Sequence, residues 1–320
     1  MSIKTNEHLM INRLLTYYTR YFAVWVLLFG VVAWFVPGPF IFLKPGMNWF
    51  FALTMFGIGV ALDAEDFKRI ARHPWVVGVG SAAQFLIMPL GAFAVTRLMG
   101  LPDELAVGLI LTGSAPGAMA SNVMSYIAKA DTAYSVSLTT VSTLLCPVLT
   151  PGLTLLLAGA RMDVSFVAMF SSVVQTVVLP LVLGFLIKIK FHKQIVPILP
   201  VFPAISATFI IFICSMVIAL NRDYLASVTG LVLITCLILN VYGMLMGYGV
   251  GALFRMETRR RRTLSIEIGM QNAGLGVVLA LTHIGERAAV PAALFVFVCI
   301  ITASVMSAVW QRRSLPAQTM

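Results

Sequence analysis

The sequence predicts an all-α membrane protein whose chain crosses the bilayer ten times. Of the 320 residues, 60% are hydrophobic and only 11% are charged, and the mean hydropathy is +0.96. The apolar residues form runs long enough to cross a bilayer, and the basic residues gather in alternate loops between these runs. No soluble domain needs so much apolar sequence, so a soluble class is excluded.

Ten membrane-spanning helices are predicted, joined by loops too short for a separate soluble domain. Before them, residues 1–20 are expected to form a cytoplasmic or interfacial segment and not a cleavable signal, because Glu7, Arg13 and Arg20 interrupt its apolar positions. Residues 311–320 are expected to form a cytoplasmic tail. The predicted spans cover residues 21–37, 47–62, 75–98, 104–128, 131–158, 165–187, 201–220, 226–253, 263–284 and 288–310.

The basic residues are divided unevenly between the two sides of this arrangement. Seventeen of the 22 fall in the terminal segments and in the loops after spans 2, 4, 6 and 8. Because positively charged loops stay in the cytoplasm, both termini are predicted to be cytoplasmic, in a multi-pass protein of the cell (inner) membrane. The run of arginines from Arg259 to Arg262 is interpreted as an anchor of this orientation, with anionic lipid headgroups as an alternative partner. The other side holds Lys44, Arg97, Arg161, Arg222 and Arg287.

The composition argues against several other classes of protein. The net charge of +10 sits in short loops, so nucleic acid is not an expected partner, and no obligate protein partner is evident. Ser121 and Cys299 lack a nearby base for nucleophilic catalysis, so an enzyme is not predicted. Four cysteines lie far apart in apolar runs, without the spacing of a metal site or a disulfide set: Cys146, Cys214, Cys236 and Cys299.

Spans 4 and 9 contain residues that interrupt a helix at a similar depth. Span 4 carries Pro116 and Gly117 ahead of a serine–asparagine pair, and span 9 carries Gly269 ahead of a glutamine–asparagine pair. Paired interruptions in matching spans indicate the binding site of a transporter. With five spans in each half, the second half enters from the opposite side, so we expect inverted repeats at residues 21–158 and 159–310.

Glu267 is the only one of the twelve acidic residues that falls well inside a predicted span. An ionisable group at the centre of a membrane helix costs roughly 2.5–3.5 kcal/mol even on a lenient insertion scale, so it needs a partner. No basic residue lies at a span centre to provide one. A bound cation is the partner we expect, and a carboxyl that is protonated or paired across helices is the structural alternative.

Oxygen-bearing side chains in neighbouring spans add to this signal. Ser135 and Thr139 in span 5 lie four residues apart on one helix face, and Gln84 is the strongly polar interior residue of span 3. Singly, such residues more often bond a helix backbone or a neighbouring helix than an ion. Together with Glu267 and Gln271, which share a helix face, they favour an ion site.

Three stretches of sequence resemble one family. Residues 116–131 (PGAMASNVMSYIAKAD) and 135–144 (SVSLTTVSTL) resemble the fourth and fifth spans of the bile acid:sodium symporter family, and residues 267–275 (EIGMQNAGL) resemble the ninth. The similarity extends over essentially the whole chain, which is identified as a bacterial member. It implies ten helices in two inverted five-helix repeats, a panel domain of spans 1, 2, 6 and 7, and a core domain of spans 3–5 and 8–10. Discontinuous helices 4 and 9 would cross in the core.

The resemblance also implies two sodium sites that share one carboxylate. Sodium is a hard cation that prefers oxygen ligands, and two cations on one carboxylate leave a positive excess that favours a nearby anion. The implied ligands of one site are Ser121, Asn122, Ser135, Thr139 and Glu267; those of the other are Gln84, Glu267, Gln271 and the backbone carbonyls of Ile268 and Met270.

The same resemblance places the substrate at the helix breaks, where helix N-termini present N–H groups to an anion. Met119 stands where relatives commonly have a threonine, and Cys299 and Ile300 stand where some bacterial relatives have His-Asn. The implied function is sodium-coupled symport of a small organic anion by alternating access, with a bile-acid-like, pantoate-like or keto-acid-like carboxylate as substrate. The implied substrate contacts are Asn272, Ala118, Met119, Ala120 and Cys299.

Three other interpretations stay open at this point. Glu267 titrates and couples transport to protons, or the carrier exports an anion such as a metalloid oxyanion. From a different class, a membrane sensor binds its ligand without moving it, although no appended signalling domain is evident in the sequence. Uptake that follows a pH gradient in sodium-free buffer would select proton coupling.

Overall fold

The computed structural model describes residues 14–15, 17–19, 21–159, 161–162 and 165–312. This part of the chain is helical apart from short connections and one isolated β-bridge. The prediction of an all-α protein is therefore confirmed. The segments predicted at residues 1–20 and 311–320 lie largely outside the described residues.

Several of the described helices are long and apolar enough to cross a bilayer by themselves, which supports a multi-pass membrane protein. A further span is counted if Lys44–Ala61 and Ala64–Arg72 are one bent span. The interrupted spans 4 and 9 do not qualify, because each is a pair of short helices. The number of ten crossings therefore stays a prediction. The five helices that qualify alone are Pro74–Leu98, Thr132–Ala158, Phe166–Lys190, Val201–Leu253 and Ala289–Arg312.

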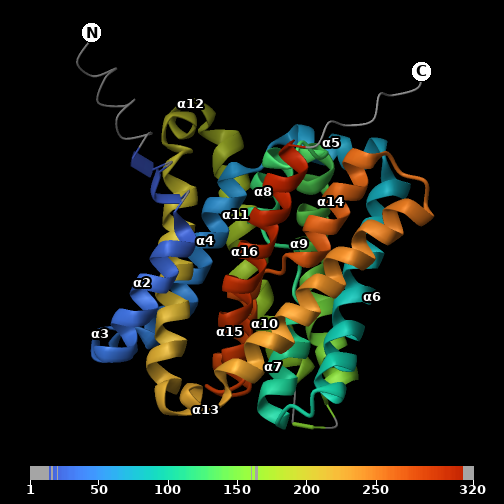
Figure 1. Cartoon of the computed structure of the whole chain (residues 1–320). Coiled ribbons are helices and arrows are strands. Elements are labelled where there is room, and N and C mark those ends of the chain that lie inside the picture. Colours follow the sequence, from blue (N-terminus) through green and yellow to red (C-terminus); the bar gives the residue numbers. More distant parts are fainter. Residues whose placement is uncertain (1–13, 16, 20, 160, 163–164, 313–320) are drawn as a thin grey trace. The chain divides into compact units, whose positions relative to one another are not determined.

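The helices pack into two compact units, each built from two separate parts of the chain. The first unit contains the described residues up to Asp63 together with Ser171–Leu225. Its elements are α2 (Phe22–Phe35), α3 (Gly38–Phe42), the 3₁₀-helix η1 (Lys44–Gly46), α4 (Met47–Ala61), the π-helix η2 (Val174–Val178), α11 (Leu179–Lys190), α12 (His192–Ile195), the 3₁₀-helix η3 (Val196–Ile198) and the first part of α13 (Val201–Leu253) (Figure 1).

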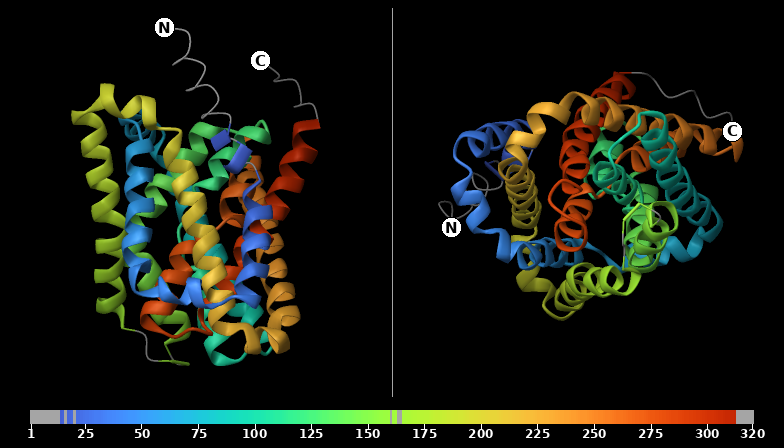
Figure 2. Two further views of the ribbon diagram at one scale, coloured as in Figure 1. Left: turned by 90° about the vertical axis from the view of Figure 1, so that its left-hand side faces the viewer. Right: turned by 90° about the horizontal axis from the view of Figure 1, so that it is seen from below.

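Within the first unit, α4 and α11 lie side by side (Figure 2). A side chain at Gly59 would collide with the Leu181 carbonyl, and a side chain at Gly184 would collide with the Phe56 carbonyl. Small residues at a helix interface let the two backbones approach closely, which is the usual way for membrane helices to pack.

The second unit contains Ala64–Phe170 and the described residues from Ala226 onward. It carries every residue that the sequence predicts for the ion and substrate sites. Its elements are α5 (Ala64–Arg72), α6 (Pro74–Leu98), α7 (Asp103–Gly113), α8 (Ala120–Ile127), α9 (Thr132–Ala158), most of α10 (Phe166–Val173), the second part of α13, α14 (Thr258–Gly269), α15 (Ala273–His283) and α16 (Ala289–Arg312) (Figure 1).

Local sequence signals set the ends of the helices that carry these residues. Asp131 caps α9 by accepting the Tyr134 N–H at 3.0 Å, and Asn272 caps α15 by accepting the Leu275 N–H at 3.2 Å. Pro74 occupies the first position of α6, where a missing N–H removes no helix hydrogen bond.

Two predicted connections between spans differ from the structure. Between predicted spans 7 and 8, at residues 221–225, the structure has a kink in place of a loop: two helical parts of α13 join at Asn221, which departs from helical geometry (φ −118°, ψ 16°). Residues 222–225 contain neither glycine nor proline, so the helix resumes at once. In addition, α14 begins at Thr258, so the run Arg259 to Arg262 lies in its first turns and not in a loop.

Candidate functional site

Two helix interruptions meet in the second unit. Residues 114–119 separate α7 from α8, and residues 270–272 separate α14 from α15. The two segments pair through an antiparallel bridge between Gly117 and Gln271. Backbone groups freed by the interruptions satisfy one another in this way, as they must at membrane depth. The flanking hydrogen bonds join Ala118 N–H to the Met270 carbonyl (2.9 Å) and Asn272 N–H to the Pro116 carbonyl (2.8 Å).

Glu267 lies on α14, close to this bridge, and is 1% exposed. Its Oε2 accepts hydrogen bonds from Ser121 Oγ at 2.5 Å and from Ser135 Oγ at 2.8 Å, and its Oε1 accepts one from Thr139 Oγ1 at 2.6 Å. Thr139 Oγ1 also lies 3.3 Å from Asn122 Oδ1, which places Asn122 beside the group. The structure therefore brings together all five residues predicted for the first ion site.

The charge of Glu267 has no cationic partner in the described part of the chain, where every ion pair involves another carboxylate. Hydroxyl donors stabilise a carboxylate but leave its charge in place. Gly117 is required at this spot, because a side chain there would overlap the Glu267 carboxylate. At Gly117 the backbone of the first helix break therefore lies directly against the carboxylate, with no side chain between them.

The residues predicted for the second ion site form a chain of hydrogen bonds around the end of α14. Gln84 Nε2 donates to Gln271 Oε1 at 2.8 Å, and Gln271 Nε2 donates to the Ile268 carbonyl at 3.0 Å. The Met270 carbonyl already accepts the Ala118 N–H across the bridge. Gln84 is 2% exposed, and its Oε1 has no hydrogen-bond partner among the described residues.

The oxygen atoms gathered here could serve as ligands of a hard cation. They are carboxylate, hydroxyl, amide and backbone carbonyl oxygens, the ligand types that alkali and alkaline-earth ions prefer. In the described ranges, no cluster of three or more histidine, cysteine or acidic side chains is present that would bind a transition metal. The buried Gln84 Oε1, which lacks a donor, fits a cation and does not fit an anion.

The residues predicted to contact substrate are less closely grouped. Ala118, Met119 and Asn272 are half-buried, Ala120 is exposed, and Cys299 is buried, with its Sγ directed to the Val296 carbonyl. Two N–H groups that we expected to face an anion, those of Ala118 and Asn272, instead donate hydrogen bonds to backbone carbonyls across the bridge. The reason is that a helix break in a membrane protein must first satisfy its own backbone.

Sequence reasoning missed two polar contacts in this unit. Asn240 on α13 donates from Nδ2 to the Gly269 carbonyl at 2.7 Å, and an asparagine within an apolar run was the available signal. Arg262 is buried, and its Nη1 donates to the Ala128 carbonyl at 3.2 Å and to the Trp310 carbonyl at 3.3 Å. Arg262 therefore ties α14 to α8 and α16, a packing role that the sequence did not reveal.

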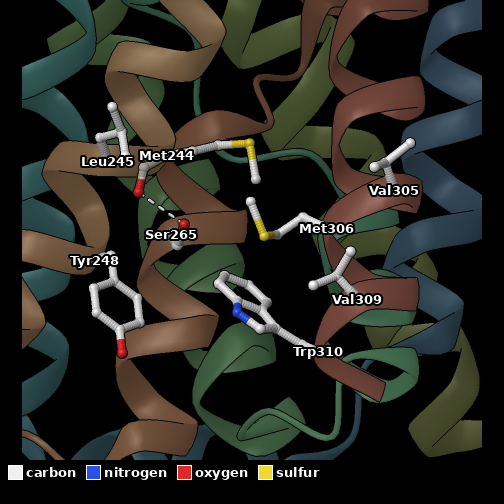
Figure 3. A pocket seen from close by; sticks show the side chains of 8 residues that line it. All are labelled: Met244, Leu245, Tyr248, Ser265, Val305, Met306, Val309 and Trp310. Carbon is white, nitrogen blue, oxygen red and sulfur yellow. Dashed lines mark hydrogen bonds between the residues drawn. The ribbon is translucent and has the colours of Figure 1, made fainter. Parts of the chain in front are cut away.

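A separate cavity of about 440 Å³ lies among α13, α14 and α16 (Figure 3). Figure 3 shows Met306 and Trp310 pointing into it, and the hydroxyl of Ser265 hydrogen-bonded to the Met244 carbonyl at 2.7 Å. The lining is almost entirely apolar and includes none of the predicted ion or substrate ligands. The side-chain oxygen atoms of its lining are the hydroxyls of Tyr248 and Ser265, too few for an ion site. The lining residues are Met244, Leu245, Tyr248, Ser265, Val305, Met306, Val309 and Trp310.

A buried carboxylate at a pair of joined helix breaks, within a multi-pass helical protein, is typical of membrane transporters. Comparison with known sequences identifies the particular family. The sequence model of the Sodium Bile acid symporter family matches residues 49–228. The chain belongs to this family of sodium-dependent transporters.

Named relatives agree with this assignment. A Bacillus subtilis (strain 168) protein, "Uncharacterized sodium-dependent transporter YocS", is 39% identical over 293 residues, which cover 91% of each chain. "Probable sodium/metabolite cotransporter BASS1, chloroplastic" of Arabidopsis thaliana is 36% identical over 93% of this chain and 74% of the relative. "Probable sodium/metabolite cotransporter BASS2, chloroplastic" of Oryza sativa subsp. japonica is 35% identical over 98% of this chain and 75% of the relative. These relatives are named as transporters and not as enzymes, and sodium is the coupling ion of the family.

Proposed function

We propose that the chain is a secondary active transporter that couples the entry of sodium to the uptake of a small organic anion by alternating access. The observation that carries this proposal is the buried Glu267 carboxylate, which accepts three hydroxyl hydrogen bonds and forms no ion pair within the described residues. A carboxylate at membrane depth needs a counter-charge. The family's dependence on sodium supplies the identity of that charge.

In this proposal two sodium ions share Glu267. When an ion enters the first site, the hydroxyl hydrogens turn away and their oxygen lone pairs face the cation, because hydroxyl groups both donate and accept. The partnerless Gln84 Oε1 supports the second site, since a cation would satisfy this buried oxygen. The first site comprises Ser121, Asn122, Ser135, Thr139 and Glu267; the second comprises Gln84, Glu267, Gln271 and the carbonyls of Ile268 and Met270.

The proposed substrate is a small carboxylate of the keto-acid, pantoate or bile-acid type. Two cations against one carboxylate leave a single positive charge, which a monovalent anion at the helix breaks neutralises. The relatives named as sodium/metabolite cotransporters support a small-molecule substrate. The residues that we propose to contact it are Asn272, Ala118, Met119, Ala120 and Cys299.

The division into two units supports the wider architecture that we propose. The first unit contains predicted spans 1, 2 and 7 and most of span 6, as expected for a panel domain, and the second contains predicted spans 3–5 and 8–10, as expected for a core domain. Residues 21–158 and 159–310 would form two inverted five-helix repeats. Both termini would lie in the cytoplasm, with the protein in the cell inner membrane.

The proposed stoichiometry supplies enough free energy for accumulation. Two sodium ions and one monovalent anion carry one net positive charge inward, and the membrane potential contributes about 2.3 kcal/mol per 100 mV for that charge. Each tenfold sodium gradient contributes about 1.4 kcal/mol per ion. Together these terms allow accumulation well beyond tenfold.

The test begins with purified protein that is screened for thermal stabilisation by keto acids, pantoate and bile acids, in sodium and in potassium. A stabilising anion is then used for uptake into proteoliposomes. We expect uptake that requires an inward sodium gradient and that Glu267→Ala abolishes while the variant remains folded and inserted. Uptake driven by a pH gradient in sodium-free buffer would instead establish proton coupling, and binding without uptake would indicate a sensor.

A further inference from the structure

We propose that Asn240 supplies a sodium ligand at the C-terminal end of α14, in addition to the ligands assigned above. Asn240 lies on α13, in the predicted eighth span, and is 0% exposed. The inference rests on the proposed sodium-coupled function, because it assigns a further residue to the second ion site. It starts from the hydrogen bonds of the carbonyl groups where α14 ends.

The last turn of an α-helix leaves carbonyl groups without partners inside the helix, so each needs a donor from elsewhere. At the end of α14 all four carbonyls have one, and the last is served by a side chain from another helix. The donors are Met270 N–H for residues 266 and 267, Gln271 Nε2 for Ile268 (3.0 Å) and Asn240 Nδ2 for Gly269 (2.7 Å).

These hydrogen bonds determine which way the side-chain amides face. The Gly269 carbonyl can only accept, so Asn240 turns Nδ2 toward it and Oδ1 away from it. Likewise, Gln271 must turn Nε2 toward the Ile268 carbonyl, so its Oε1 accepts from Gln84 Nε2. The amide oxygens that remain, Asn240 Oδ1 and Gln84 Oε1, are both buried and have no partner within the described residues.

The two partnerless oxygens approach the same helix end from two different helices. Asn240 lies one turn before Gly243, where a side chain would meet the Ile268 carbonyl at 3.1 Å and would collide with the Met88 sulfur. Met88 in turn lies one turn after Gln84 on α6. The faces of α13 and α6 that carry the two amides therefore meet beside the last carbonyls of α14.

A buried amide oxygen without a donor is unfavourable, and two at the same helix end would be doubly so unless a positive ion joins them. A sodium ion satisfies both oxygens at once and adds to the neutralisation of Glu267. Oxygen ligands from α6, α13 and α14 would then surround one ion. This chemistry assigns Asn240 Oδ1 to the same ion as Gln84 Oε1.

The experiment titrates purified, full-length protein with sodium chloride at constant ionic strength, with potassium chloride as the balance, and follows thermal unfolding. Asn240→Leu removes the ligand and should raise the sodium midpoint about tenfold, as expected for one lost contact to a charged group. Asn240→Asp also loses the donor to Gly269 but keeps an oxygen, so its midpoint should equal or fall below that of the wild type. The matched control is Thr235→Val on the same helix, where Oγ1 bonds only the Leu231 carbonyl of its own helix.

The outcomes separate this inference from the proposed function. If sodium fails to stabilise the wild type, the proposed function falls and this inference falls with it. If sodium stabilises the wild type and Asn240→Leu equally, only the inference is overturned. If Asn240→Asp binds sodium as weakly as Asn240→Leu, Asn240 merely holds Gly269 and is no ligand. Should Asn240→Leu not fold, the aspartate variant decides alone: a midpoint about tenfold higher than wild type overturns the ligand role.

Discussion

The two helix breaks pair with each other, but different side-chain groups donate hydrogen bonds to the backbone carbonyls that each break leaves free. At the break between α7 and α8, the hydroxyl of Thr150 donates to the free Ser114 carbonyl, whereas at the break between α14 and α15 the donors are the side-chain amides of Gln271 and Asn240. The Thr150 bond is 2.7 Å long, and two further hydroxyls, those of Thr112 and Ser114, bond carbonyls within the end of α7, at Gly108 (2.7 Å) and Ile110 (2.8 Å).

This difference supports the proposal that the second break carries ion ligands of its own. A hydroxyl uses one oxygen both to donate and to accept, so a single hydrogen bond satisfies it in part. An amide that donates from its nitrogen still has a separate carbonyl oxygen, which needs a donor or a cation when it is buried. The second break also follows directly after the carboxylate of Glu267. The first break contributes its close backbone approach at Gly117, and α8 behind it contributes Ser121. We therefore propose that residues 114–119 of the first break act as a structural joint, and that the ions are held by the second break together with Ser121 and Asn122 of α8 and the hydroxyls of α9.

The largest expected effect comes from neutralising the carboxylate on the second break. Glu267→Gln should abolish the thermal stabilisation that sodium gives to the purified protein, because no other charge remains to attract the ion. In potassium the variant should be at least as stable as the wild type, since a buried unpaired charge has been removed. Asp223→Asn, which removes the same charge from an exposed position, is the control and should leave the sodium response intact.

A slightly smaller effect is expected where the first break touches the carboxylate. Gly117→Ala places a methyl group against Glu267, and overpacking of this kind costs about 1–3 kcal/mol. Sodium affinity in a stability titration should fall roughly 10–100-fold. Gly78→Ala on α6, where a side chain meets open space, serves as the matched control. Equal midpoints for the two variants would mean that the first break does not shape the ion site.

An intermediate effect is expected from a single hydroxyl beside Glu267. Thr139→Val keeps the shape of the side chain but removes both a hydrogen bond to the carboxylate and a proposed ligand, so the sodium midpoint should rise about tenfold. Thr154→Val on the same helix α9 removes a hydroxyl that bonds only the Thr150 carbonyl. The sodium midpoint of that variant should equal that of the wild type. If both variants raise the midpoint by a similar amount, Thr139 contributes to packing and not to sodium binding.

The smallest effect on sodium is expected at the first break itself. Thr150→Val removes the donor to the Ser114 carbonyl and leaves that buried group unsatisfied, which should lower stability by about 1–3 kcal/mol. The sodium midpoint should not move, because no proposed ligand changes. Thermal unfolding in potassium and in sodium measures both quantities. A raised sodium midpoint would contradict the division between a structural break and an ion-binding break.

The residues proposed as ion ligands could be picked out from the sequence for a physical reason, and the structure brings them together. Glu267, Gln84 and the hydroxyls of α9 stand out because polar side chains in apolar spans are expensive and therefore visible. Pro116 and the glycines marked both breaks for the same reason, since they disrupt a helix wherever it packs. Side-chain identity was sufficient in each of these cases.

Features that depend on backbone partners escaped prediction. Asn240 bonds a carbonyl that becomes free only because α14 ends at Gly269, and nothing in the local sequence connects the two positions. The N–H groups of Ala118 and Asn272 were expected to face an anion, but pairing across the bridge uses them. The tight kink at Asn221 was predicted as a loop because polar residues there suggested one, although residues 222–225 return at once to helical geometry.

Equilibrium binding of radioactive sodium to the purified protein tests the central claim most directly, because it needs no knowledge of the substrate. The account predicts saturable binding of two ions per chain to the wild type and none to Glu267→Gln under the same conditions. Equal sodium binding by the two proteins would contradict it, since the shared carboxylate would then not be what holds the ions.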